Sequence, residues 1–354
     1  MLLGHESGVF KTSYRSDMAI YRLPLSRAAV AGTVVLLLLL PVLLPVQYLT
    51  WASLAAIAVT GAIGLNLLTG YTGLISLGQA GFMAVGGYTT AIASTRYGVP
   101  LLLAIPLGGL GAAMVGVVVG LPSRRVKGIY LAIATIAAQL IIEWTINHVK
   151  WIGGGAQSSV VVKAPTLGPI EITSTSDRYY LVLAFAVLAF VLGLNIARGR
   201  VGRAFIAIRD HDIAAEVLGV DVFRYKLLAF GVSSFFAGIA GGVWTAYLGI
   251  ANYEMFTLTV SIEYLAMIAI GGLGVMLGSV FGAVFVTILP LAVQDVLTRF
   301  QGSIPVDDVP AFTSQLRLAL FGFLIMVFMV IEPEGLYRIW RAVKNYFRFW
   351  PFRY

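Results

Sequence analysis

The amino-acid sequence predicts an all-α polytopic membrane protein with about ten transmembrane helices. Of its 354 residues, 59% are hydrophobic and only 11% are charged, whereas soluble domains carry about 25% charged residues. Apolar runs close to the roughly 20 residues that one membrane helix needs recur along the chain. The chain also contains 39 glycines, and small residues allow membrane helices to approach one another closely.

The predicted spans lie between turns that contain glycine, proline or charged residues, and the eighth and tenth spans are short. They cover residues 28–45, 51–69, 74–95, 101–121, 128–147, 179–197, 226–249, 260–273, 277–297 and 317–331. A basic tail precedes the first span, and no small-x-small cleavage site follows that span directly. We therefore expect the first span to be retained rather than removed as a signal peptide.

The basic residues predict the orientation of the chain. If the N-terminus is cytoplasmic, 18 of the 24 lysines and arginines lie on that side, counting Lys226 at the inner end of the seventh span. These inner segments are the N-terminal tail, 70–73, 122–127, 198–225, 274–276 and the C-terminal tail. Such a bias predicts that both termini are cytoplasmic, because basic loops stay on the inner side of a membrane.

This orientation divides the chain into three parts. Residues 1–27 form a cytoplasmic N-terminal tail, 28–331 form the transmembrane domain, and 332–354 form a cytoplasmic or interfacial C-terminal tail. The last part is rich in tryptophan, tyrosine and phenylalanine, and tryptophan and tyrosine favour the depth of the lipid headgroups. We expect a multi-pass protein of the plasma (cytoplasmic or inner) membrane, in contact with lipid.

One hydrophilic segment stands between two of the apolar spans. Residues 198–226 hold 10 of the 40 charged residues in 29 positions. The pattern is typical of short helices on a membrane surface. A soluble partner and the lipid headgroups are both suitable ligands for such a surface, and the segment alone leaves these two readings open.

Local signals predict the structure of this segment. Asp212 is placed to cap a helix that begins at the next residue, and Asp221 to cap the helix that enters the membrane. Gly219 is placed to end the first of these helices in a left-handed conformation. Residues 203–209 form a further helical turn or two. The result is a short, stiff element that exposes Arg203, Arg209 and Glu216.

Two glycine-rich segments, 61–88 and 271–282, have two explanations. Close packing of helices accounts for the glycines. A helix broken beside a translocation path also accounts for them, because irregular backbone at membrane depth persists only where protein or a water-filled cavity satisfies its polar groups. On the second reading the candidate path residues are Gly73, Ser76, Gln79, Gly81, Gly271, Gly272 and Gly274.

Several kinds of site are absent from the sequence. There is no cysteine, and the three histidines are isolated from metal-binding spacings. We expect no catalytic residues, no metal and no bound cofactor. There is no G-x-x-x-x-G-K-[ST] loop, so any ATP and magnesium would bind to another subunit. The net charge of +8 lies largely on the predicted cytoplasmic face, which argues for lipid headgroups and against nucleic acid.

Five runs of the sequence resemble the permease subunits of ABC importers for branched-chain amino acids, in particular the LivM-type subunit. The resemblance extends from about residue 55 to residue 331. The runs are G-Y-T-G-L-I-S-L-G-Q-A-G-F-M-A-V-G-G-Y (70–88), K-G-I-Y-L-A-I-A-T (127–135), G-R-A-F-I-A-I-R-D-H-D-I-A-A-E-V-L-G-V (202–220), Y-K-L-L-A-F-G-V-S-S-F-F-A-G-I-A-G-G (225–242) and I-G-G-L-G-V-M-L-G-S-V-F-G-A (270–283).

The resemblance implies partners and a role for the hydrophilic segment. Such permeases work with a second permease subunit, two ATP-binding cassette subunits and an extracytoplasmic solute-binding protein. A cytoplasmic coupling helix contacts the ATPase, and segment 198–225 would carry it here. The implied ATPase-coupling residues are Arg203, Arg209, Asp212, Ala214, Ala215, Glu216 and Gly219.

Other functions stay open at this point. Relatives often carry an acidic residue after the fifth span, whereas this chain has W-I-G-G-G-A-Q at 151–157. Urea, short amides or other amino acids are therefore alternative cargoes to branched-chain amino acids. A stand-alone secondary transporter would need ion-coupling carboxylates inside the spans. A membrane-embedded enzyme would need a cluster of histidine and acidic residues.

Overall fold

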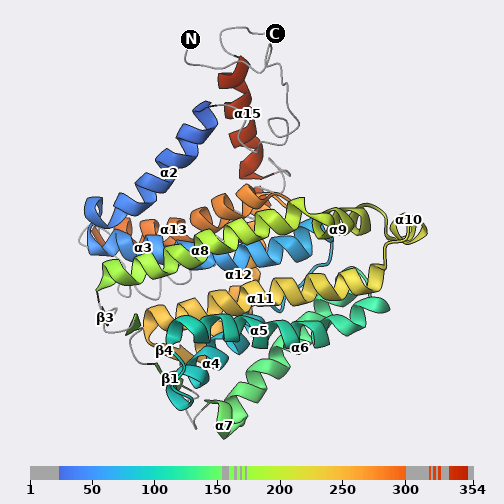
Figure 1. Cartoon of the computed structure of the whole chain (residues 1–354), viewed down its shortest axis with the longest axis horizontal. Helices are drawn as coiled ribbons and strands as arrows, with labels where there is room; N and C mark the ends of the chain where they lie inside the picture. The colour runs from blue at the N-terminus through green and yellow to red at the C-terminus, as the bar shows by residue number, and fades with distance from the viewer. Residues whose placement is uncertain are drawn as a thin grey trace.

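A computed structural model describes residues 24–153, 159–162, 166–167, 170–171, 174–299, 319, 322–323, 326–327 and 335–349. The described part is mostly helical (Figure 1). Its long helices are α2 (Pro24–Leu43), α3 (Val46–Leu65), α4 (Gln79–Arg96), α5 (Leu101–Gly120), α6 (Ile129–His148), α8 (Thr175–Arg198), α11 (Val222–Leu248), α12 (Leu258–Gly271), α13 (Met276–Arg299) and α15 (Leu336–Phe349).

Shorter elements join these helices. They are η1 (Asn66–Tyr71), η2 (Leu121–Arg124), α7 (Lys150–Gly153), β1 (Ser159–Val161), β2 (Thr166–Leu167), β3 (Ile170–Glu171), α9 (Arg200–Asp210), α10 (Asp212–Val217), β4 (Ile250–Asn252) and η3 (Tyr253–Phe256). In the described part, β1 pairs antiparallel with β4, and β2 pairs antiparallel with β3.

Within the described residues, seven helical segments are long and apolar enough to cross a membrane. They are Val46–Tyr71, Leu101–Arg124, Ile129–His148, Thr175–Arg198, Val222–Leu248, Tyr253–Gly271 and Met276–Val296. Each overlaps one of the predicted spans. Together they make the chain a multi-pass helical membrane protein.

Of the remaining three predicted spans, one begins later than expected, one corresponds to α2, and one lies mostly outside the described residues. The predicted span 74–95 is wrong at its start, because α4 begins only at Gln79 and residues 73–78 are not helical. The first predicted span corresponds to α2, whose apolar part with described side chains is Ala31–Leu43. Most of 317–331 lies outside the described residues.

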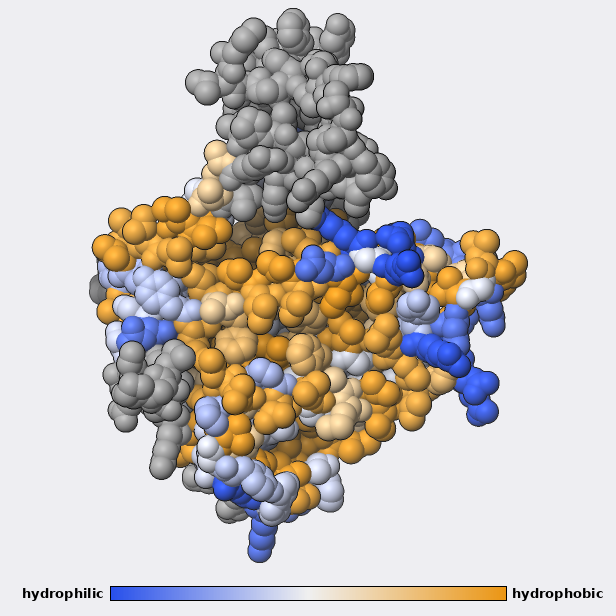
Figure 2. Space-filling view, in the orientation of Figure 1, coloured by the Kyte–Doolittle hydropathy of each residue, from blue (hydrophilic) through white to orange (hydrophobic). Residues whose placement is uncertain are grey.

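Two helices form the centre of the bundle. The apolar stretches of α3 and α11 are 78% and 72% buried, whereas those of α6 and α8 are each 28% buried. The outer helices expose large apolar side chains, such as Leu103 of α5 and Trp144 of α6. The surface is accordingly hydrophobic along the helices, and its hydrophilic residues gather towards the helix ends (Figure 2). Such a surface suits lipid contact.

Glycines allow the central helices to touch. A Cβ atom added to Gly86 of α4 would lie 2.2 Å from the Cα atom of Gly238 in α11. A Cβ atom on Gly241 would lie 2.0 Å from the carbonyl oxygen of Met83. Both separations are too short for any side chain larger than hydrogen, so the prediction that glycines permit close helix packing is confirmed.

Segments predicted on the same side of the membrane meet at one end of the bundle. At the end that carries α9 and α10, the Arg124 guanidinium lies 5.5 Å from the ring centre of Phe223. At the other end, the Arg96 guanidinium lies 5.3 Å from the Trp151 ring centre, and β1 pairs with β4. Figure 1 shows α9 and α10 at the right-hand end and these strands at the left.

Candidate functional site

The first glycine-rich segment interrupts the helical structure. After α3, the backbone widens into the π-helix η1, and residues 73–78 then run without helical structure to the start of α4. Gly73 has a φ of +74°, a left-handed conformation that favours glycine. The Gln79 side chain donates a hydrogen bond of 2.9 Å to the carbonyl oxygen of Gly61 in α3. This hydrogen bond therefore joins the end of the interruption to α3 inside the bundle.

Buried side chains satisfy the backbone of this interruption. The Leu77 amide donates to the Thr135 hydroxyl at 2.9 Å, and the Ala80 amide donates to the Ser261 hydroxyl at 2.8 Å. Ser261 in turn donates to the amide oxygen of Gln139 at 2.6 Å. Thr135 and Gln139 belong to α6 and Ser261 to α12, so three separate parts of the chain meet at this point.

The second glycine-rich segment contains a tighter interruption between α12 and α13. Gly272 and Gly274 have φ values of +124° and +75°. The Asn66 amide donates to the carbonyl oxygen of Val275 at 2.9 Å and to the hydroxyl of Ser279 at 2.6 Å. Its oxygen accepts a hydrogen bond of 2.9 Å from the Gly274 amide. One buried side chain in η1 therefore holds the second interruption against the first.

Arg209 joins both interruptions to the surface element. Its guanidinium donates a hydrogen bond of 3.0 Å to the carbonyl oxygen of Gly70, and a second one of 3.0 Å to the neighbouring Asp210 carboxylate. A Cβ atom on Gly73 would lie 3.1 Å from the Arg209 Cγ atom, and one on Gly274 would lie 2.8 Å from its Nη1 atom. We call Arg209, Gly70, Gly73 and Gly274 the arginine junction.

Helix α9 is fixed to the bundle by its apolar face. Phe205 is completely buried and packs in a cluster with Leu68 of η1, Leu74, Leu131 of α6 and Phe230 of α11. The opposite face of α9 is charged. Through its apolar face, α9 packs directly against the first interruption.

Asp212 does not act as the predicted helix cap. Helix α10 begins at Asp212 itself, and no side chain caps it. The carboxylate instead pairs with Lys127, which precedes α6, and lies 3.8 Å from the ammonium group of the buried Lys226 in α11. The hydrogen bond from Lys127 holds the pKa of the Asp212 carboxyl below its ordinary value, and the charge of Lys226 acts in the same direction.

The other two local predictions for this segment are confirmed. Gly219 has a φ of +88°, and its amide donates to the Glu216 carbonyl oxygen while the Val220 amide donates to that of Ala215. This pair of bonds is the Schellman motif that ends a helix. Asp221 caps α11 through a hydrogen bond of 3.1 Å from the Arg224 amide.

The outer surface of α10 combines apolar and polar side chains. Val217 and Leu218 are 83% and 82% exposed, and Ile213 is also exposed. Among the predicted coupling residues, Ala214, Glu216 and Arg203 are exposed. Arg209 and Gly219 are exposed as well, although the Arg209 guanidinium also takes part in the arginine junction. Asp212 is half-buried, and Ala215 is buried and faces the protein.

Five of the seven predicted path residues, Ser76, Gln79, Gly81, Gly271 and Gly272, are buried in this conformation, whereas Gly73 is exposed and Gly274 is half-buried. Ser76 and Gln79 are each 1% exposed. A Cβ atom on Gly81 would lie 3.2 Å from the Cα atom of Gln139, and one on Gly271 would lie 2.0 Å from the Gly278 carbonyl oxygen. Gly73 follows η1 closely in the chain, and the Gly274 amide donates to Asn66 of η1. The role of all seven residues in a path stays a prediction.

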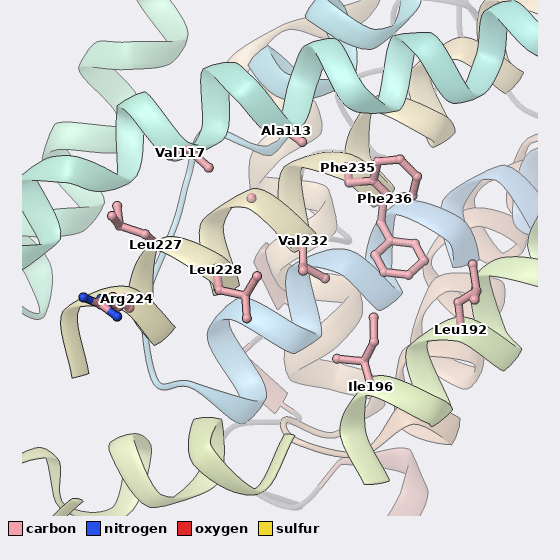
Figure 3. Close-up of a pocket in the computed structure, with 11 residues that line it drawn as sticks. Ala113, Val117, Leu192, Ile196, Arg224, Leu227, Leu228, Val232, Phe235 and Phe236 are labelled. Carbon is pink, nitrogen blue, oxygen red and sulfur yellow. The ribbon is translucent and has the colours of Figure 1, made fainter. Parts of the chain in front are cut away.

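An apolar groove lies on a different surface of the bundle. It has a volume of about 510 Å³ and lies between α5, α8 and α11. Figure 3 shows Phe236, Val232 and Leu228 along its floor and Arg224 at one end. The residues that line it include none of the predicted path residues. Elsewhere in the described part of the chain, no group of three or more histidine, aspartate or glutamate residues is arranged to hold a metal ion.

Sequence reasoning missed three buried polar residues, Asn66, Gln139 and Ser261. Each lies in an apolar stretch without a motif, and only their partners, which are more than 100 positions away, give them a role. Lys127 begins one of the runs that carry the family resemblance, but its pairing with Asp212 spans 85 positions and has no local signal.

The fold and the site together define a class, that of a multi-pass membrane protein in which a rigid surface element contacts two interrupted membrane segments. The model of the family described as branched-chain amino acid transport system / permease component matches residues 47–330. The chain belongs to this family of ABC transporter permeases.

The names of individual relatives specify different transported substrates. The chain is 31% identical over 308 residues to the high-affinity branched-chain amino acid transport system permease protein LivM of Escherichia coli, covering 80% of this chain and 68% of that protein. It is 26% identical over 199 residues to the guanosine ABC transporter permease protein NupQ of Bacillus subtilis, covering 51% and 60% of the two chains.

A third relative, the autoinducer 2 import system permease protein LsrC of Klebsiella pneumoniae, is 29% identical over 259 residues, covering 69% of this chain and 66% of that protein. No solved structure matches the chain. The relatives are transport permease subunits, and their names include no enzyme.

Proposed function

We propose that the chain is the permease subunit of an ABC importer that moves branched-chain amino acids into the cytoplasm. The family match and the similarity to the LivM protein over most of the chain support this cargo. Other relatives are named for guanosine and autoinducer 2, and the sequence leaves urea, short amides and other amino acids as alternative cargoes. These alternative cargoes are therefore included among the test substrates.

The proposed architecture has ten transmembrane spans in the inner membrane, and both termini lie on the cytoplasmic side. Two observations support this orientation. The end of the bundle with α9 and α10 carries the basic segments 122–127 and 198–226, and basic segments remain on the cytoplasmic side. The two interruptions reach the same end, where Arg209 contacts them.

The partners in this proposal are a second permease subunit, two ATP-binding cassette subunits and an extracytoplasmic solute-binding protein. This chain would bind no cofactor, and ATP with magnesium would bind to the cassette subunits. The described part supports a docking role for α10, because its apolar side chains Val217 and Leu218 project from the bundle. An exposed apolar patch on a charged surface is typical of a protein-binding site.

The proposed coupling mechanism rests on one observation, the contact between α9 and both interruptions. Closure of the ATPase subunits would displace α10, and α9 follows because the two helices are separated only by His211. The Phe205 cluster and the Arg209 hydrogen bond would then transmit the displacement to the interrupted segments. ATP shifts the conformational equilibrium only as far as its affinity differs between the two states.

Reconstitution of the complete importer in liposomes tests the proposal. The assay measures uptake of radiolabelled leucine, isoleucine and valine beside urea, acetamide, guanosine and polar amino acids. We expect ATP-dependent uptake of the branched-chain amino acids, with a cassette variant that cannot hydrolyse ATP as the control. Uptake of another substrate alone would replace the proposed cargo. Uptake that persists without ATP hydrolysis would identify a stand-alone transporter or channel.

A further inference from the structure

Helix α15 has two chemically different faces. Leu336, Ile339, Trp340 and Val343 recur at the spacing of one helical face. Three basic residues, Arg338, Arg341 and Lys344, lie on the other side of the helix, and α15 contains no acidic residue. Basic residues opposite aromatic and aliphatic ones are typical of a helix that lies in the surface of a membrane.

The apolar face of α15 has little protein over it. Ile339, Trp340, Val343 and Tyr346 are 47%, 49%, 44% and 58% exposed. The Trp340 ring centre lies 5.7 Å from that of Phe281 in α13, and Leu336 at the start of the helix packs against the main core. The exposed side chains include the tryptophan and tyrosine that favour the depth of lipid headgroups.

The direction of α15 is the one expected for a helix that lies in the surface of a membrane. The helix runs across the direction of α3, α8 and α11 (Figure 1). Because those helices cross the membrane, a helix across them lies parallel to the membrane plane. At the cytoplasmic surface of the membrane, a helix in this direction would place its apolar side in the acyl region and its basic side towards headgroup phosphates.

The start of α15 is fixed against the second interruption. Gly335 has a φ of +71°, and a Cβ atom there would lie 2.6 Å from the Ile270 carbonyl oxygen and 2.7 Å from the Gly272 nitrogen. No side chain larger than hydrogen fits at this contact. The position of α15 on the membrane is therefore linked to the backbone of the Gly272 turn.

We propose that α15 is a membrane-surface helix that binds the headgroups of anionic phospholipids through Arg338, Arg341 and Lys344, and that this binding holds the helix against the second interruption. Each basic side chain near an anionic surface strengthens binding about fivefold. The occupant of the apolar face is thus the lipid bilayer. The inference requires that the chain spans a membrane and does not depend on its cargo.

Site-directed spin labelling of the whole chain tests the proposal, because the natural sequence has no cysteine. Val343→Cys places a label on the apolar face, and Asn345→Cys places a matched label on the polar face. The measurement compares label accessibility to oxygen and to a water-soluble nickel complex, in vesicles of phosphatidylcholine alone and with phosphatidylglycerol. We expect label 343 to be shielded from nickel and label 345 to be accessible, with a larger contrast in the anionic vesicles.

A charge variant separates lipid binding from simple packing. Combining Arg338→Gln, Arg341→Gln and Lys344→Gln should remove the effect of phosphatidylglycerol on label 343, whereas Arg338→Lys with Arg341→Lys should keep it. Equal nickel accessibility of both labels in both kinds of vesicle would overturn the proposal. Shielding of label 343 only after the other importer subunits are added would also overturn it, since the apolar face would then bind protein. The accessibility of the two labels can be measured whether or not the chain transports the proposed cargo. Failure of the transport assay would therefore not affect this test.

Discussion

At the scale of single residues, Arg209 combines an exposed position on α9 with a hydrogen bond into the bundle. Its guanidinium donates to the Gly70 carbonyl oxygen and lies against Gly274. The side chain thus connects a surface helix with two interrupted segments. Its predicted role in coupling to the ATPase stays a prediction, and the arginine junction adds the prediction that Arg209 positions the interrupted segments.

Replacing Arg209 should uncouple ATP hydrolysis from transport. Arg209→Gln removes a charge-assisted hydrogen bond of about 1.5–3 kcal/mol, so the reconstituted importer should hydrolyse at least about ten times more ATP per imported molecule. The measured quantity is the ratio of ATP hydrolysed to substrate imported. Arg200→Gln makes the same charge change at the start of α9 and should leave the ratio unchanged. Equal ratios for both variants would contradict the role of the arginine junction.

Gly219 provides a test of backbone conformation without a change in packing. A Cβ atom at this position meets no atom within 4 Å, but the φ of +88° is strained for other residues. Gly219→Val should destabilise the end of α10 by about 1–3 kcal/mol and reduce coupled uptake. Gly219→Asn, which tolerates a left-handed conformation better, should retain most of it. If the valine variant transports normally with the natural ATP ratio, α10 does not transmit the displacement.

The Asp212 carboxylate makes a pH-dependent contribution to stability. Its pKa is lower in the folded protein than its ordinary value of 3.8, so it stabilises the fold above that pH, and the contribution is lost as the pH falls through it. Part of the contribution therefore persists until the pH falls below the lowered folded pKa. Asp212→Asn should lower the thermal unfolding midpoint of the purified protein more at pH 7 than at pH 3. An equal difference at both pH values would show that the charge of Asp212 is not the source of its effect.

At the scale of elements, α9 packs between the protein surface and the first interruption. Its Phe205 ring is fully buried among residues of η1, α6 and α11. Phe205→Ala should cost about 3–5 kcal/mol of stability, measured as the loss of folded protein in detergent thermal melts. Phe205→Leu conserves most of the volume and should cost less than about 1.5 kcal/mol. A small loss for the alanine variant would mean that α9 is only loosely attached.

Elements set by local chemistry could be predicted, and those set by distant partners could not. Gly219 and Asp221 act through backbone groups within five positions, and both were predicted correctly. Asp212 was predicted wrongly as a cap, because Lys127 competes for its carboxylate from 85 positions away. Residues 74–78 were predicted as helical because they are apolar, but Thr135 and Ser261 stabilise the adjoining backbone in another conformation.

At the scale of the whole molecule, composition and charge predicted a helical membrane bundle and the grouping of its loops at two ends. The depth of the interruptions and the central position of α3 and α11 follow from tertiary contacts, which a periodic apolar sequence does not encode uniquely. The structure shows both close helix packing and interrupted helices in the glycine-rich segments, and the translocation path beside them stays a prediction. Gly86 and Gly238 allow close packing, and Gly73 and Gly274 lie in interruptions.

The docking of α10 on an ATPase subunit is the central claim, and proximity crosslinking in the assembled importer tests it most directly. Val217→Cys, at a site 83% exposed on α10, and Val161→Cys, at a site 71% exposed on β1, are each labelled with a photoactivatable crosslinker. We expect label 217 to crosslink to an ATPase subunit, more strongly with bound ATP, and label 161 to show no such product. Crosslinking from 161 and none from 217 would contradict both the docking site and the orientation of the chain.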